Sequence, residues 1–149
     1  MKKEILKIQP QSSYQKQGKK NQQAGARFER KVRADLEDKG WIVSKWQNNV
    51  EFYIDAQKSP HVFGKLIPAK QGRFRKTSTG FPDFICMKRI SMIPAPNYEV
   101  FGVEAKSKGY LSKEEKEKCK WLLDNNIFNK ILIASKGKKR GSIEYNEFS

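Results

Sequence analysis

The chain has 149 residues, with 31 basic and 16 acidic side chains and a formal net charge of +15. Its length is that of one domain with a buried core, and no apolar run approaches the ~20 residues of a membrane-spanning helix. Two cysteines and one histidine supply neither four zinc ligands nor a disulfide framework. The N-terminus has no apolar segment of a secretory signal. We therefore expect an intracellular protein, cytoplasmic or nucleoid-associated, or in a host cell if the chain is viral.

The excess of positive charge predicts a polyanionic partner, because neutralising phosphates releases their counterions. Residues 56–82 carry six basic side chains and no acidic one, and a second basic cluster covers residues 136–140. A solvated lysine-rich surface is the alternative interpretation. No basic amphipathic helix with an aromatic face is present, so we expect no membrane partner.

The first 22 residues are rich in Gln, Ser and Lys and predict a flexible basic arm. A helix is predicted from about residue 24 to 39, because apolar side chains recur every fourth residue and Gly40 follows as a stop. The recurring side chains are Phe28, Val32 and Leu36.

The middle of the chain alternates between short apolar segments and turns, which predicts strands. The predicted strands cover residues 41–46, two short segments within 50–68, and residues 81–87, 98–106 and 127–134. A basic loop is expected over residues 69–80. The residues SKEE, from Ser112 to Glu115, form a capping box that predicts a second helix reaching about Asp124.

This order of elements predicts a single α/β domain with a central mixed sheet of four or more strands flanked by helices. We expect a core over residues 23–135, with an inserted basic segment over about 48–80. Residues 1–22 and 136–149 are the expected arm and a loose basic tail.

Three polar side chains interrupt two of the apolar strands. Asp83 follows Pro82 at the start of one strand, and Glu104 and Lys106 share one face near the end of another. If these strands are neighbours, Asp83 and Glu104 converge on one hard cation, with the backbone carbonyl of Ala105 as a third oxygen ligand. Lys106 would then orient or deprotonate a water, or offset charge on a phosphate.

The first helix adds a further candidate. Glu29 lies on the helix stripe that contains Gly25, Val32 and Leu36, so it is predicted to face inward, where a metal site would satisfy it. The alternative is a solvent-facing ion pair between Glu29 and Arg33.

Basic and hydroxyl side chains around these segments are candidate contacts to DNA phosphates, and a solvated mobile loop is the alternative for the segment before Asp83. The candidates are Lys19, Lys20, Arg27, Arg30, Arg73, Arg75, Lys76, Ser78 and Lys108. No phosphate-binding loop of the type GxxxxGK[ST] occurs, so no nucleotide cofactor is expected.

Three stretches of this chain resemble the PD-(D/E)XK nuclease superfamily over about residues 23–135. GARFERKVRADLEDKGW is similar to the opening helix of archaeal Holliday-junction resolvases, and GFPDFICM and VFGVEAKSKGYLSKEE are similar to strands of that branch and of VRR-NUC nucleases. The resemblance implies a restriction-endonuclease-like core and Mg²⁺ as cofactor, with Mn²⁺ as a substitute. It implies that the catalytic residues are Glu29, Asp83, Glu104 and Lys106. Glu115 stands about where VRR-NUC relatives often have Gln.

Together these patterns predict a Mg²⁺-dependent DNA endonuclease that is selective for branched DNA, and the resemblance implies a homodimer. A nuclease of another specificity (flap, nicking, single-strand or restriction type) is one alternative. A non-catalytic basic nucleic-acid-binding protein is another, and a ribosome-associated basic protein would account for the charge alone.

Overall fold

The computed structural model describes residues 13–55, 62–69 and 80–149. The elements in chain order are α1 (Ser13–Asp38), β1 (Ile42–Lys45), β2 (Asn48–Ile54), β3 (Val62–Pro68), β4 (Phe84–Ser91), β5 (Asn97–Ala105), α2 (Lys113–Asp124), β6 (Ile131–Lys136) and β7 (Ile143–Glu147). Within the described ranges, neither helix is both long and apolar enough to cross a membrane.

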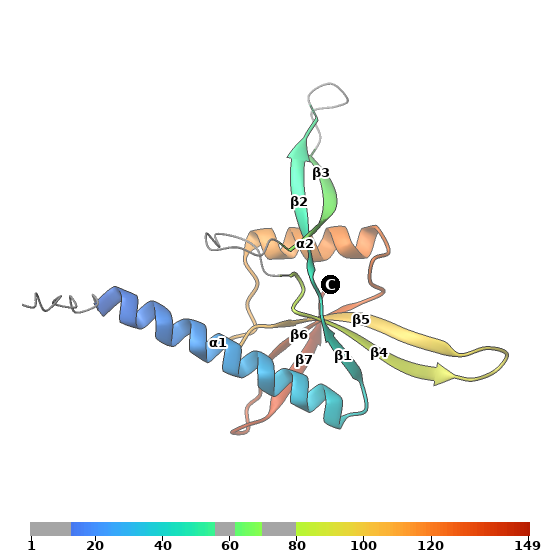
Figure 1. Cartoon of the computed structure of the whole chain (residues 1–149), viewed down its shortest axis with the longest axis horizontal. Coiled ribbons are helices and arrows are strands. Elements are labelled where there is room, and N and C mark those ends of the chain that lie inside the picture. Colours follow the sequence, from blue (N-terminus) through green and yellow to red (C-terminus); the bar gives the residue numbers. More distant parts are fainter. Residues whose placement is uncertain (1–12, 56–61, 70–79) are drawn as a thin grey trace, which may run out of the picture.

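Five strands form one mixed sheet in the order β1-β4-β5-β6-β7. β5 and β6 are parallel and are joined through α2, whereas the other neighbouring pairs are antiparallel. β2 and β3 form a separate antiparallel hairpin, which rises beyond α2 and away from the sheet in Figure 1. The predicted single α/β domain with a central mixed sheet is confirmed.

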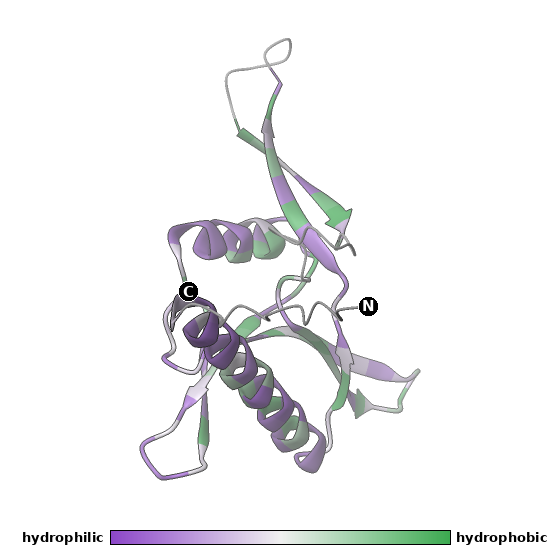
Figure 2. Cartoon of the chain, turned by 60° about the vertical axis from the view of Figure 1, so that its left-hand side comes forward, coloured by the Kyte–Doolittle hydropathy of each residue, from purple (hydrophilic) through white to green (hydrophobic). Residues whose placement is uncertain are grey.

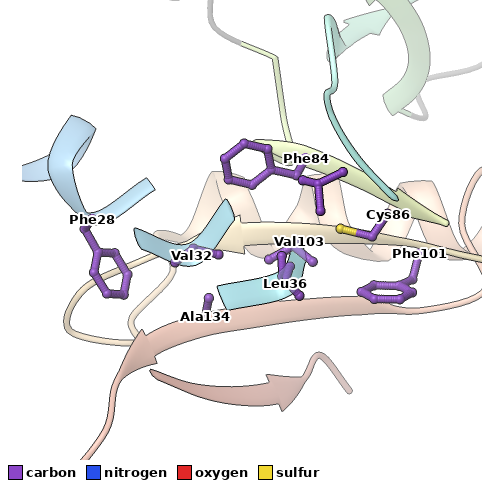
Figure 3. Packing of buried hydrophobic residues seen from close by; sticks show 9 residues of the cluster. Phe28, Val32, Leu36, Phe84, Cys86, Phe101, Val103 and Ala134 are labelled. Atoms are coloured by element: carbon purple, nitrogen blue, oxygen red, sulfur yellow. The ribbon is translucent and has the colours of Figure 1, made fainter. Parts of the chain in front are cut away.

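The two helices cover opposite faces of this sheet. α1 packs its buried residues against side chains from β1, β4 and β5 (Figure 3), whereas α2 contributes Cys119 and Leu122 to a second cluster. β6 shows the separation residue by residue: Ala134 belongs to the α1 side, and Ile131 and Ile133 belong to the α2 side. Period-two alternation along β6 thus joins two cores through one strand.

The first helix is longer than predicted. α1 begins at Ser13, so the flexible arm predicted for residues 1–22 is wrong for residues 13–22, and residues 1–12 lie outside the described part. The N-terminal half of α1 is exposed and extends past the sheet (Figures 1 and 2). Apolar periodicity could not reveal it, because exposed residues carry no buried stripe. Its Gln, Lys and Ala residues have good helix propensity instead.

The C-terminal segment is also more ordered than predicted. Residues 143–147 form β7, which pairs with β6, and the Tyr145 hydroxyl donates a 2.7 Å hydrogen bond to Asp35 Oδ2 on α1. The loose tail predicted from residue 136 is therefore wrong. Only Ile143 and Tyr145 alternate with polar neighbours here, which is too short a pattern to indicate a strand by itself.

The inserted segment contains the two expected strands, β2 and β3. Val50 at the base of the hairpin is buried in the α2-side cluster, and Gly64 lies directly against the indole of Trp121. A Cβ at Gly64 would come within 2.1 Å of Trp121 Nε1, so a glycine is required for this close approach. The hairpin is thereby anchored near its base by Val50 and, farther toward its tip, by the contact of Gly64 with α2. Most of the predicted basic loop, residues 70–79, lies outside the described part.

Truncating Leu122 tests the α2 face. Leu122 is fully buried, whereas its neighbour Leu123 is only partly buried. We expect Leu122→Ala to lower the free energy of unfolding by about 2–5 kcal/mol, and Leu123→Ala to cost clearly less. Urea denaturation monitored by Trp fluorescence measures both. Equal losses would contradict the packing of α2 described here.

Candidate active site

β4 and β5 bring the two predicted acidic residues together. The antiparallel register pairs Phe84 with Val103, so Asp83, one residue before β4, lies opposite Glu104 near the end of β5. The strands are neighbours, as the convergence of these carboxylates required.

The two acids are linked through each other's backbone. The N–H of Asp83 donates to Glu104 Oε2 at 3.1 Å, and the N–H of Ala105 donates to Asp83 Oδ2 at 2.9 Å. Glu104 is only 5% exposed. A third hydrogen bond, from the N–H of Trp46 to the carbonyl of Asp83 at 3.1 Å, joins Asp83 to the segment that follows β1. The backbone thus holds one oxygen of each carboxylate.

The environment favours the protonated form of both acids. Burial raises the pKa of Asp83, and the charge of Glu29 adds to the rise. Burial also raises the pKa of Glu104, and the neighbouring charge of Asp83 raises it further, although Lys106 acts in the opposite direction. The buried carboxylate of Glu104 and the partly buried one of Asp83 therefore oppose each other's ionisation. A cation bound between them would remove this opposition.

Lys106 lies between two carboxylates. Its Nζ is 3.2 Å from Glu104 Oε1 and 2.5 Å from Glu115 Oε1. Burial alone would lower the pKa of Lys106, but Glu115 and Glu104 together hold it above its usual value. Lys106 is therefore a cation at neutral pH.

The predicted capping box is present and positions Glu115. Ser112 Oγ accepts from the N–H of Glu115 at 3.2 Å, and Glu115 Oε2 accepts from the N–H of Ser112 at 2.8 Å. The other oxygen of Glu115 holds Lys106. Glu115 thus caps the N-terminus of α2 and also holds Lys106 in position. The sequence identified the cap but not this second contact, which only the fold creates.

These side chains line one cleft of about 490 Å³. Its walls come from the ends of β4 and β5, from α1 and from the start of α2. The predicted residues on it are Gly25, Glu29, Asp83, Glu104, Ala105 and Lys106. The four predicted catalytic residues therefore border a single hollow.

Glu29 faces this cleft but is occupied by a different partner. Its Oε2 lies 2.6 Å from Nζ of Lys45 on β1, and Arg33, the alternative partner, pairs with Glu37 instead. Sequence reasoning missed Lys45. The signal was available, because strand alternation puts Lys45 on the same face as Val43, which packs under α1.

The cleft residues fit a hard divalent cation by their chemistry. Asp83 and Glu104 offer carboxylate oxygens, and Ala105 lines the same cleft; Mg²⁺ prefers one or two carboxylates completed by waters. Across residues 13–55, 62–69 and 80–149, no three His, Cys, Asp or Glu side chains gather into a ready-made metal site. Participation of Glu29 as a ligand stays a prediction. Cys86 and Cys119 are free and buried, and burial raises the pKa of each to about 12.

The predicted phosphate contacts divide into two groups. Lys19, Lys20, Arg27 and Arg30 are exposed on α1, and Lys108 is exposed just after β5. Arg73, Arg75, Lys76 and Ser78 lie outside the described residues, so their expected contact with the cleft stays a prediction.

Comparison of the chain with protein-family models, with curated proteins and with solved structures finds no match in any of the three.

The pair formed by Asp83 and buried Glu104 predicts how the stability of the metal-free protein depends on pH. Because folding raises the pKa of Glu104, the folded state binds this proton more tightly than the unfolded chain. Its stabilising contribution is complete below the pKa of the unfolded carboxyl and is lost as pH rises through the raised, folded pKa. Glu104→Gln removes this loss. We expect the variant to gain about 1–3 kcal/mol relative to wild type between about pH 5 and about pH 8.

Urea denaturation at several pH values in EDTA measures this difference. Glu117→Gln, which removes an exposed carboxylate from α2, is the control and should run parallel to wild type. A Glu104→Gln curve that also runs parallel to wild type would show that the pair is not a source of strain.

Proposed function

We propose that this chain is a Mg²⁺-dependent endonuclease that hydrolyses phosphodiester bonds in DNA. The observation that carries the proposal is the pair formed by buried Glu104 and partly buried Asp83 at one cleft. Each carboxylate accepts a backbone N–H from the facing strand, and the ammonium of Lys106 lies beside Glu104. An arrangement that costs folding free energy and that a hard cation would relieve is typical of a functional site. The net charge of +15 supports a polyanionic substrate.

Asp83, Glu104 and the carbonyl of Ala105 would hold the metal. When bound, Mg²⁺ supplies positive charge that makes a water easier to deprotonate and that offsets the charge of the phosphate. The backbone bonds to Asp83 and Glu104 keep one oxygen of each carboxylate fixed, which limits the reorganisation that binding requires. In the reaction, water attacks phosphorus, the P–O bond to the leaving oxygen breaks, the water loses a proton and the leaving oxygen gains one.

Of the alternatives for Lys106, the electrostatic one is favoured. A lysine between two carboxylates, with its pKa held above the usual value, keeps its proton in the metal-free protein, which supports the electrostatic role. Its ammonium can donate a hydrogen bond to the attacking water or to a phosphate oxygen. Glu115 fixes where that ammonium lies.

The substrate class within DNA rests on resemblance. The helix around Gly25 and Glu29 and the segment around Asp83 are similar to junction resolvases, so branched DNA is the leading candidate. A symmetric dimer would place two clefts on two strands.

Cleavage by wild type and Asp83→Asn tests the proposal. Labelled four-way junction, flap, linear duplex and single strand are incubated with Mg²⁺ or Mn²⁺. We expect wild type to cut the junction, and Asp83→Asn to lose at least about 10²-fold in rate while binding DNA as tightly or more tightly, because a negative charge near phosphate is removed. Asp55→Asn, a change in the hairpin away from the cleft, is the control and should cut normally.

Preference for another substrate would retain the active site and replace the branched-DNA claim. Tight binding without cleavage of any substrate, with either metal, would favour the non-catalytic binding protein.

Glu115 is expected to act as a positioning residue. Glu115→Ala removes one of the two carboxylates that hold Lys106, so we expect kcat to fall about 10- to 100-fold with little change in KM. Glu115→Gln keeps an oxygen acceptor at the same place and should recover most of the rate. A merely structural contribution would lower the melting temperature of Glu115→Ala and leave the kcat of its folded fraction unchanged.

A further inference from the structure

A second hollow, of about 400 Å³, lies between α1 and the turn that joins β6 to β7. We call it the turn pocket. Five exposed basic side chains from three segments line it: Lys31 on α1, Lys136 at the end of β6, and Lys138, Lys139 and Arg140 in the turn. Among the described residues, no carboxylate lines it.

The positive charge of the turn pocket is not neutralised internally. Within the described residues, none of its five cations forms an ion pair, whereas Lys39, Lys45 and Lys118 each pair with a nearby carboxylate. Glu144, the carboxylate that contacts the turn, accepts from the backbone N–H of Lys138 at 3.2 Å. Five unpaired cations around one hollow repel each other, and a bound anion relieves that repulsion.

The turn holds its own shape. The N–H of Gly137 donates to the Ser142 carbonyl at 2.9 Å, and both the N–H and the hydroxyl of Ser142 donate to the Lys139 carbonyl. Gly141 adopts φ +84°, in the left-handed region that glycine enters without strain. The basic side chains therefore project from a closed turn held by hydrogen bonds.

The turn pocket is next to the cleft. Phe28 of α1 lines both hollows. Lys136 donates its backbone N–H to the carbonyl of Ser107 at 3.2 Å, and Ser107 lines the cleft. The parallel pairing of β5 with β6 explains this, because it puts the carboxyl ends of both strands at one edge of the sheet.

We propose that the turn pocket binds backbone phosphates of the nucleic acid strand whose phosphodiester occupies the cleft. A strand carries a phosphate about every 3.4 Å along a duplex axis, so a strand in the cleft presents further phosphates next to Phe28. The assignment of the neighbouring hollow as the site of cleavage rests on the proposed function. The phosphate affinity of the turn pocket does not.

The test compares two variants with the same loss of charge. The first replaces Lys138, Lys139 and Arg140 by Ala. The control replaces Lys113, Lys116 and Lys120 by Ala, three exposed residues of α2. Fluorescence anisotropy with a labelled DNA duplex in EDTA, over a series of salt concentrations, gives the affinity and its salt dependence. Melting temperatures confirm that both variants fold.

We expect the turn variant to bind DNA about tenfold more weakly at low salt and to lose about 1–2 units of the log–log salt slope, since each phosphate contact contributes about 0.9. The α2 variant should keep the wild-type slope. Replacing Lys138 and Lys139 of the wild type by Arg keeps both charges, so Lys138→Arg and Lys139→Arg should preserve DNA binding. Equal salt slopes for the turn variant and the α2 variant would overturn the proposal. So would polyglutamate that competes with the DNA equally well for wild type and for the turn variant.

Cleavage is scored separately on the same proteins. A reduced slope with no cleavage by wild type would support the turn pocket and remove the proposed nuclease activity. Cleavage by wild type with an unchanged slope in the turn variant would support the nuclease and overturn the turn pocket.

Discussion

Two hydrogen bonds across the β4–β5 pair organise the candidate site. Each joins a carboxylate to the backbone of the facing strand: Asp83 N–H to Glu104, and Ala105 N–H to Asp83. They form only if Phe84 lies opposite Val103, and a shift of one residue in register would turn Glu104 to the other face of the sheet. The geometry of the candidate site therefore depends on the register between β4 and β5.

The packing of both faces maintains that register. Phe84 and Val103 are buried under α1, next to the residues that carry the acids, and Ile131 and Ile133 of the adjacent parallel strand are buried under α2. Moving β4 along β5 would expose apolar side chains on one face and bury polar ones. The free energy of burial on the two faces thus offsets the cost of placing two like charges side by side.

The distribution of cations follows a pattern. Near the acids, Lys45 and Lys106 are each held by at least one carboxylate, which fixes their position. Along the neighbouring edge, the cations of the β6–β7 turn form no ion pair with any residue that the structure describes. Paired cations are suited to precise placement at a reacting group, and unpaired ones to long-range attraction of a polyanion. Phe28 lines both the cleft, which contains Lys106, and the turn pocket, which contains the unpaired cations.

Elements with a local sequence pattern could be predicted from the sequence alone. The apolar repeat of Phe28, Val32 and Leu36, the capping box at Ser112 and the alternation in β5 each lie within a few residues and were read correctly. The exposed half of α1 was not predicted, because it buries no side chains and shows no apolar repeat. The strand β7 was not predicted, because it is too short to show a period.

The contacts between side chains of the site could be identified only from the three-dimensional structure. That Glu29 meets Lys45, that Glu115 holds Lys106, and that the β6–β7 turn adjoins the cleft all follow from which strands pair and which helix crosses them. Such contacts join residues distant in sequence or separated by a change of element, so no local period encodes them. The sequence contained the candidate site residues, and the three-dimensional pairing of strands placed them on one edge of the sheet.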